Sequence, residues 1–370
     1  MLKYRRMPIE IESPEEMGYG NIDCNLAESS VTDALLPDLK IDLGKLVLAY
    51  GDHFGKPELR ALIAADAPTL KPDDVLLTVG AAAALFIVAT SLLNPDDHIL
   101  VAFPNYATNI ETPRTIGCQM DFVRLNFEDG YKIDIEALAE RITPQTRLVS
   151  LTCPHNPTGS MISEADLRRL IDIVETKGCY LLFDETYREM SFGGALPPAA
   201  SLSSKAISVS SLSKTYGLPG IRMGWLICRD PQLKQIFLAA KEQIFISNSV
   251  VDEEIAYRFL QHKAEHLGRI NAHIQTNFAV VKNWMAAQED IEWVEPQGGV
   301  VCFPRIKPDS GVDVDKFYKV LNTVYKTFVG PGHWFESERR HMRVGYGWPS
   351  QAELEKGLHN ITQALLAAKD

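Results

Sequence analysis

The sequence predicts an α/β protein: a large domain built on a mostly parallel, seven-stranded sheet, and a smaller α+β domain. From about residue 75, short and wholly apolar runs alternate with amphipathic helical patterns. This alternation is typical of parallel strands that are covered by helices on both faces. A length of 370 residues also favours two domains over one.

Seven apolar runs are the expected strands of the large sheet. They lie at 75–80, 98–104, 119–125, 147–154, 180–185, 206–212 and 223–228. The last two are joined by a glycine-rich turn with little room for a helix, so we expect one antiparallel strand. The intervening helices carry their own end signals, as in the segment from Ser163, with an acidic first turn, to Gly178.

The flanking segments complete the predicted domain organisation. Residues 1–45 are too polar and broken to fold alone, so we expect an arm that packs on the small domain or on a partner subunit. The large domain is expected at 46–250 and the small C-terminal domain at 286–370. Between them, the helical pattern at 251–285 predicts an interdomain helix.

Composition excludes several classes of function. The formal net charge is −11, from 37 Lys and Arg against 48 Asp and Glu, which argues against a nucleic-acid surface. No apolar run approaches the ~20 residues of a membrane helix, and we see no signal-peptide pattern at the start. Six scattered cysteines without a C-x-x-C pair are typical of reduced thiols. We therefore expect a cytoplasmic protein that binds neither nucleic acid nor membrane.

Chemically useful residues gather at the carboxyl ends of the predicted strands. Ligands of open α/β sheets bind at that edge. The residues concerned are Gly80, Ala81, Ala82, Tyr106, Asn156, Asp184, Tyr187, Ser211, Ser213 and Lys214. Gly80 ends a strand and enters a helix at once, so its free backbone amides form a phosphate cradle. Arg222 adds a fork-shaped cation near Lys214.

A phosphate cradle, a buried acid and a lysine among serines fit pyridoxal 5′-phosphate (PLP). Only a lysine amine forms a Schiff base with the cofactor's aldehyde. A carboxylate such as Asp184 holds the proton on the pyridine nitrogen, which makes the ring an electron sink. Lys214 is therefore the predicted covalent anchor and proton shuttle, and Arg222 the neutraliser of the phosphate.

Longer motifs resemble the class I/II aminotransferases, PLP enzymes of fold type I. "SLSKTYGLPGIRMGW" is similar to the family's lysine signature, "CPHNPTG" to its asparagine–proline loop and "FDETY" to its Asp-x-x-Tyr strand end. "YGDHFGKPELR", "VGPGHWF" and "HMRVGYGW" resemble further family motifs. The matches follow family order from about Tyr50 to Trp348.

The resemblance implies a role for each matching residue. Lys214 carries the Schiff base and the 1,3-proton transfer. The cofactor contacts are Asp184 at the pyridine nitrogen, Asn156 and Tyr187 at the phenolic oxygen, Tyr106 on the ring face, and Gly80, Ala81, Ala82, Ser211, Ser213 and Arg222 at the phosphate. Tyr50 reaches the phosphate from a second subunit, which implies a homodimer. The Gly-Ala-Ala loop departs from relatives with serine, threonine or lysine there, which predicts weaker cofactor binding.

The resemblance also implies contacts to the substrate. Arg343 is expected to clamp the α-carboxylate bidentately, with Asn156 beside it. Several motifs look most similar to the capreomycidine synthase-like subgroup, whose members and arginine-oxidising cousins act on arginine or its derivatives. Glu16 and Glu28 could then present carboxylates to a guanidinium, and His333 and Trp334 are further candidates for the side-chain pocket.

Three functions remain open at this point. The leading hypothesis is an aminotransferase of amino acid metabolism that acts on an amino acid and a 2-oxo acid. An arginine-type oxidase or cyclase would use the same cofactor site, and a non-catalytic binding protein could retain the fold. "HKAEH" at 262–266 matches a zinc-peptidase pattern but lies in a polar helix with no evident third ligand, so no metal is expected.

Overall fold

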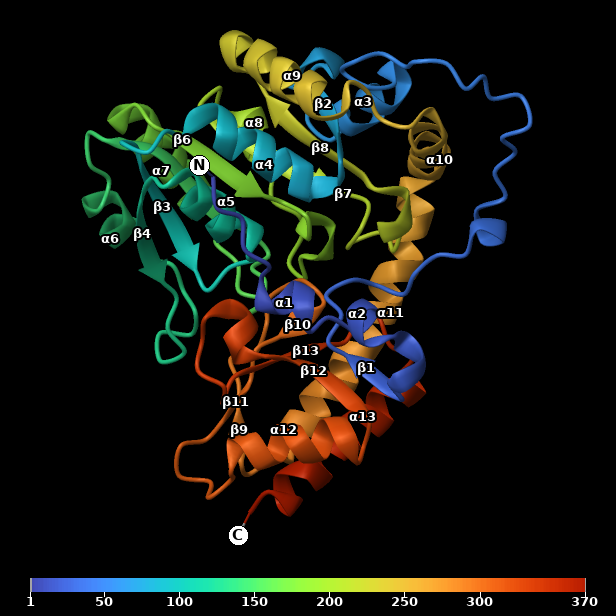
Figure 1. Cartoon of the computed structure of the whole chain (residues 1–370), viewed down its shortest axis with the longest axis vertical. Helices are drawn as coiled ribbons and strands as arrows, with labels where there is room; N and C mark the ends of the chain where they lie inside the picture. Colours follow the sequence, from blue (N-terminus) through green and yellow to red (C-terminus); the bar gives the residue numbers. More distant parts are fainter. Residues whose placement is uncertain (1, 370) are drawn as a thin grey trace.

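The computed structural model describes residues 2–369 and divides the chain between a large sheet and a smaller α+β region (Figure 1). The large sheet has seven strands in the order β2-β8-β7-β6-β5-β3-β4. They are β2 (Val75–Val79), β3 (His98–Phe103), β4 (Gln119–Arg124), β5 (Thr146–Thr152), β6 (Tyr180–Asp184), β7 (Ala206–Ser211) and β8 (Met223–Cys228). Only β8 runs antiparallel to its neighbours, β7 and β2. The predicted fold class is confirmed, including its one antiparallel strand.

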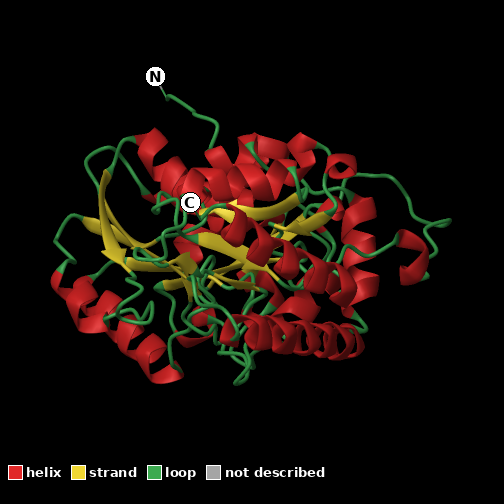
Figure 2. Cartoon of the chain, turned by 90° about the horizontal axis from the view of Figure 1, so that it is seen from below, coloured by secondary structure: helices red, strands yellow, loops and turns green. Residues whose placement is uncertain are grey.

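Helices cover both faces of this sheet (Figure 2). Successive strand residues point to opposite faces: Ile99 and Val101 join one apolar cluster, whereas Leu100 and Ala102 join another. The first cluster includes α4 (Gly80–Leu92), α5 (Thr108–Ile116) and α9 (Pro231–Phe245); the second includes α6 (Ile135–Glu140), α7 (Glu164–Lys177) and α8 (Ala199–Leu202). Burial on both faces explains why an inner strand such as β3 is apolar, whereas the edge strand β4 carries the exposed Asp121 and Arg124.

The smaller region is built around a four-stranded sheet of order β1-β12-β13-β10. Its strands are β1 (Cys24–Leu26), β12 (Thr327–Pro331), β13 (Met342–Gly345) and β10 (Val301–Cys302), with β9 (Ile291–Glu292) and β11 (Arg305–Ile306) paired separately. Two helices, α12 (Val314–Thr323) and α13 (Gln351–Ala367), pack beside it. Because β1 pairs in parallel with β12, the amino-terminal part of the chain belongs to this sheet.

The long helical pattern after residue 249 forms two helices in the structure. They are α10 (Val250–Leu260) and α11 (Lys263–Ala286), separated by a turn at Gln261 and His262. α10 packs against α3 (Pro57–Ala64) of the large region, whereas α11 packs against α13 of the small one. Leu267 near the start of α11 still packs with α10 on the core of the large region, and the rest of α11 packs on the core of the small one. The predicted single helix is interrupted at Gln261 and His262.

The amino-terminal segment first crosses the junction between the two regions and then leaves the body of the molecule. Two short helices, α1 (Pro8–Ile11) and α2 (Pro14–Met17), lie between the large sheet and the small region (Figure 1). After β1, residues 33–56, which include the 3₁₀ turn η2 (Leu36–Leu39), form a long loop at the edge of the molecule. Across residues 2–369, none of the helices has the length and apolar character needed to cross a bilayer.

Candidate active site

A cavity of about 350 Å³ opens at the carboxyl edge of the large sheet. The ends of β5, β6 and β7 and the start of α4 form its floor. The amino-terminal helices α1 and α2 and the strand β13 of the small region close it from the other side. The cavity therefore lies at the carboxyl ends of the strands, where the sequence predicted it, and it is also bounded by the small region.

Backbone amides at the start of α4 form one end of the cavity. Gly80 has φ +73°, and a Cβ there would lie 2.6 Å from an Arg222 guanidinium nitrogen. A Cβ on Gly224 of β8 would lie 2.4 Å from the carbonyl carbon of Gly80. No side chain caps this helix, so the amides of Gly80, Ala81 and Ala82 are free. A glycine cradle, free amides and one guanidinium fit a phosphate group.

Lys214 enters the cavity from the loop that follows β7, and it is the one lysine among the cavity-lining residues. The loop is fixed from both sides, because Thr215 Oγ1 donates to Thr186 O at 2.6 Å and Ser213 N donates to Ser211 Oγ at 3.3 Å. Burial lowers the pKa of the Lys214 amine, and Glu28 partly offsets this. A larger fraction of this amine is therefore neutral, which is the form that attacks an aldehyde.

Asp184 ends β6 with its carboxylate buried at the floor of the cavity. Its Oδ1 accepts hydrogen bonds from Thr186 Oγ1 at 2.6 Å and Thr186 N at 3.1 Å. Burial raises the pKa of this carboxyl, while the Thr186 hydrogen bonds lower it. A buried acid without a cationic partner is costly, and a protonated ring nitrogen is a group that would pair with it.

Two tyrosines and an asparagine line the same cavity as Asp184 and Lys214. Burial raises the pKa of Tyr187 to about 12, so its hydroxyl stays protonated and can donate. Tyr106 is also raised in pKa by burial and by Glu10, whose Oε1 accepts from the Tyr106 hydroxyl at 3.4 Å. Asn156 Oδ1 accepts from Arg343 Nη1 at 3.1 Å, which fixes the amide orientation.

Arg343 projects from β13 and is buried. Its Nη2 donates to Ala27 O at 2.7 Å, while its Nε is buried without a hydrogen-bond partner in the described chain. The guanidinium carbon lies 5.9 Å from the Trp334 ring and 5.1 Å from the Phe335 ring. A buried guanidinium with an unused donor, and with no carboxylate partner among residues 2–369, fits an anion such as a substrate carboxylate.

The structure brings most of the predicted site residues together. Those lining the one cavity are Ala81, Ala82, Tyr106, Asn156, Asp184, Tyr187, Ser211, Ser213, Lys214, Arg222, Glu28, Trp334 and Arg343. Gly80 lies directly behind them. Tyr50 is outside this cavity, because its side chain is 85% exposed on the long loop. Glu16 is also outside the cavity, because its side chain is exposed and lies 3.4 Å from Arg6.

Sequence reasoning missed the cavity-lining residues of the segment 8–17, three of which are polar. These are Glu10, Ser13 and Glu15. The buried Ser13 hydroxyl has no partner in the described chain. α2 spans four residues, and it turns Glu15 inward and its neighbour Glu16 outward. A helix this short has no periodic pattern, so its inward side could not be predicted.

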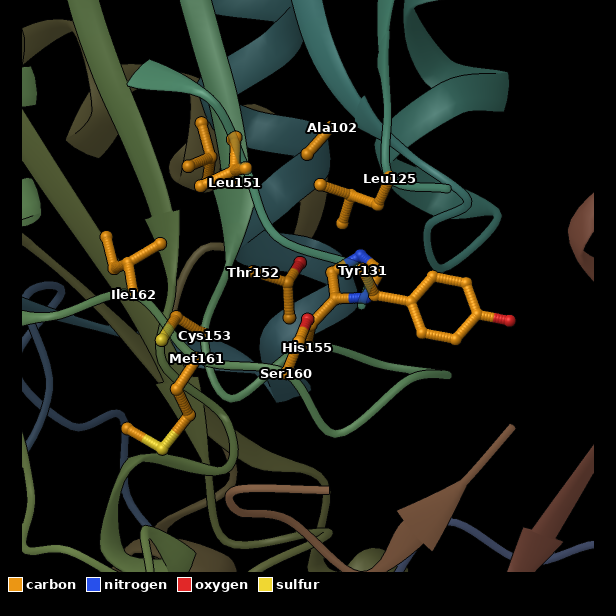
Figure 3. A pocket seen from close by; sticks show the side chains of 11 residues that line it. Ala102, Leu125, Tyr131, Leu151, Thr152, Cys153, His155, Ser160, Met161 and Ile162 are labelled. Carbon is orange, nitrogen blue, oxygen red and sulfur yellow. The ribbon is translucent and has the colours of Figure 1, made fainter. Parts of the chain in front are cut away.

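A second, much smaller cavity of about 20 Å³ lies behind the Asn156 loop (Figure 3). It is lined by His155, Thr152 and Tyr131 among others, and has about the volume of one water molecule. Burial lowers the pKa of His155 to about 4, and its Nδ1 lies 2.8 Å from Thr158 Oγ1. This neutral histidine stabilises the loop that carries Asn156, and the cavity is too small for a cofactor.

Comparison with known proteins decides the family. The protein family "Aminotransferase class I and II" matches residues 20–361 of this chain. The chain belongs to this family. Pyridoxal 5′-phosphate is therefore its cofactor, and the phosphate cradle, the buried Asp184 and the amine of Lys214 fit that molecule.

Individual members of the class I and II aminotransferases show what the chain is similar to. It is 29% identical to a capreomycidine synthase of Streptomyces vinaceus, over 88% of this chain and 82% of that protein. It is 27% identical to an arginine–pyruvate transaminase of Pseudomonas aeruginosa, over 80% and 77% of the two chains.

Solved structures agree with this fold over nearly the whole chain. A PLP-dependent aminotransferase from Streptococcus suis superposes with a TM-score of 0.91 at 27% identity, covering 99% of this chain and 100% of that one. A PLP-dependent cyclase, OrfR, superposes with a TM-score of 0.88, also at 27% identity and covering 99% of both chains.

Proposed function

We propose that the protein is a PLP-dependent aminotransferase that moves an amino group from an amino acid to a 2-oxo acid. The observation that carries this proposal is the placement of Lys214, Asp184 and the free amides of α4 around one cavity. A protein that merely bound the cofactor would not need a cavity amine of lowered pKa.

The chain's own residues divide the work between holding the cofactor and moving protons. When bound, PLP supplies an aldehyde that reacts with amines and a ring that withdraws electrons. Asp184 would hold the proton at the ring nitrogen, and Tyr187 and Asn156 would donate to the ring's oxygen. Arg222 and the α4 amides would hold the phosphate. Lys214 Nζ would take the proton from the substrate Cα and pass it to the cofactor's aldehyde carbon, which is the 1,3-proton transfer.

Arg343 is the proposed clamp for the substrate α-carboxylate. Its Nη1 is already oriented by Asn156 Oδ1, and its free Nε is buried at the cavity. Holding the carboxylate here fixes the substrate Cα, so that Lys214 can reach its proton.

The rest of the cavity favours a substrate with a cationic side chain. Glu10, Glu15 and Glu28 line it, and the negative charge of each carboxylate raises the pKa of the Lys214 amine. Neither the cofactor nor an α-carboxylate needs these acids. This lining, together with the similarity to a capreomycidine synthase and an arginine–pyruvate transaminase, supports a second candidate, a cyclase or oxidase of an arginine-type amino acid.

We also propose a homodimer whose subunits share their sites, in the cytoplasm. The loop 33–56 exposes Leu35, Leu36, Val47, Leu48 and Tyr50. Apolar side chains gathered on one loop favour burial against another copy, where Tyr50 could reach the second phosphate. The six buried, unpaired cysteines support a reducing compartment.

One experiment separates these candidates. The purified holoenzyme is mixed with each of the twenty amino acids, and PLP absorption is followed with and without pyruvate and with and without oxygen. We expect pyruvate-dependent amino transfer, with L-arginine or another cationic amino acid preferred about tenfold over neutral ones. Turnover that needs oxygen or yields a cyclic product would favour the second candidate, and no response to any amino acid would contradict both.

A further inference from the structure

Glu12 makes an unusual double contact at the rim of the cavity. One carboxylate oxygen, Oε2, lies 2.7 Å from His333 Nε2 and accepts from Trp334 Nε1 at 2.7 Å. Both donors belong to the 3₁₀ turn η6 (Gly332–Phe335), which follows β12. The Trp334 side chain is buried, so Glu12, whose own side chain is 46% exposed, supplies the acceptor that its indole N–H needs.

Trp334 connects this contact to the proposed carboxylate clamp. Its ring lines the cavity and lies 5.9 Å from the Arg343 guanidinium carbon. The Glu12 hydrogen bond fixes the edge of the indole, and thereby the ring face that Arg343 packs against. Glu12 itself is absent from the cavity lining, so any effect on the substrate must pass through other residues.

The same contact fastens the amino-terminal wall of the cavity. Ile9 packs in one apolar cluster with Trp334 and Phe335. On either side of Glu12, Glu10 and Ser13 face the cavity. α1 is a single turn, too short to hold its position without tertiary contacts. Glu12 and Ile9 therefore supply the polar and apolar halves of one attachment.

We propose that Glu12 is a positioning residue for the reaction, which sets substrate affinity by holding Trp334 against Arg343 and the segment 8–17 against the cavity. This inference rests on the proposed function. It assigns to the segment 8–17 a role in substrate binding, in addition to packing. Since the phosphate cradle and Lys214 belong to the large sheet, we expect loss of the Glu12 contact to act on the substrate and to leave the phosphate and the lysine in place.

The test compares Glu12→Ala and Glu12→Gln with the matched control Glu16→Ala. Glu16 lies in the same segment, but its carboxylate is exposed. Its one ion pair in the described chain is with Arg6, at 3.4 Å. The substrate is the amino acid with the highest kcat/KM in the screen above. We expect KM to rise about tenfold in Glu12→Ala and about threefold in Glu12→Gln, with kcat kept within about twofold. Glu16→Ala should match the wild type.

A double-mutant cycle shows whether the effect passes through the indole. Trp334→Phe keeps an aromatic ring near Arg343 but removes the N–H donor. If the hydrogen bond carries the effect, Glu12→Ala combined with Trp334→Phe raises KM no further than the larger single effect. Additive effects would overturn this route.

The remaining outcomes are also decisive. An unchanged KM in Glu12→Ala would overturn the proposal. A Glu12 variant that loses PLP absorption would show that Glu12 merely stabilises the fold. So would a variant that melts several degrees lower and in which kcat falls by as large a factor as KM rises. Either result also overturns the proposal. The wild-type PLP band and turnover test the proposed function separately, because they do not depend on Glu12.

Discussion

Glu185 follows Asp184 directly, yet the two carboxylates have different environments. Asp184 lines the cavity, whereas Glu185 Oε1 accepts from Ser208 Oγ at 2.6 Å and from Ala199 N at 2.7 Å. Ser208 belongs to β7 and Ala199 begins α8, so Glu185 joins the floor of the site to the helix behind it. Burial raises the pKa of Glu185 to about 7, although Arg188 and the two hydrogen bonds oppose this.

This raised pKa makes stability depend on pH in a defined direction. Between its ordinary pKa of 4.5 and about 7, the folded chain binds the Glu185 proton more tightly than the unfolded chain. The contribution of this proton to the free energy of unfolding is fully present below the pKa of Glu185 in the unfolded chain. It is lost as the pH rises through about 7. Glu185→Gln cannot titrate and can still accept one of the hydrogen bonds. We expect the fall in melting temperature from pH 5 to pH 8 to be smaller in this variant than in the wild type, by about 2 °C or more.

Scanning calorimetry of the apoprotein measures this difference, with the exposed Glu289→Gln as control. An identical pH dependence in Glu185→Gln and the wild type would show that Glu185 does not titrate in this range.

At the residue scale, the site could be predicted wherever a residue ends a strand. Asp184 and Lys214 follow apolar runs, and the carboxyl ends of β6 and β7 must meet at one edge. Glu10 and Glu12 could not be predicted, because their orientation depends on where one helical turn docks. Glu16 was expected near the substrate, but the turn of α2 places Glu15 there instead.

At the scale of elements, the phosphate end depends on the close approach of β8 to the first turn of α4. Gly224 permits it, since a Cβ there would lie 2.4 Å from the Gly80 carbonyl carbon and 2.6 Å from Ala81 N. Both of these atoms belong to backbone and cannot swing aside. The strands were predictable from the sequence, including the antiparallel one, but a contact between two glycines leaves no pattern in hydrophobicity.

Gly224→Ala should therefore displace the amides that hold the phosphate. We expect PLP to bind about 100-fold more weakly, which corresponds to about 2.7 kcal/mol. The control is Gly220→Ala, where a Cβ would meet nothing within 4 Å. Fluorescence titration of the apoprotein with PLP gives both dissociation constants. A change below threefold in Gly224→Ala would show that the cradle tolerates the shift.

At the scale of the whole molecule, the cavity depends on elements that lie far apart in the sequence. The large sheet supplies Lys214, β13 supplies Arg343, and α1 and α2 close the space between them. The sequence predicted both regions, but not the break between α10 and α11, because no glycine or proline marks the turn at Gln261 and His262.

The exposed loop 33–56 predicts that two subunits complete each site. Tyr50→Ala and Lys214→Ala homodimers should each lose at least about 90% of activity. If Tyr50 serves the partner's site, an equal mixture of exchanged subunits recovers about a quarter of wild-type activity, because half of the dimers then hold one intact site. Activity that stays at the parental level, in mixtures shown by light scattering to contain dimers, would contradict a shared site.

The central claim is that Lys214 Nζ bonds covalently to PLP within this cavity. Borohydride reduction of the holoenzyme, followed by peptide mass spectrometry, tests it most directly. We expect one pyridoxyl adduct per chain, located on Lys214 and absent from Lys214→Ala. An adduct on another lysine, or none in protein that retains PLP absorption, would contradict the account.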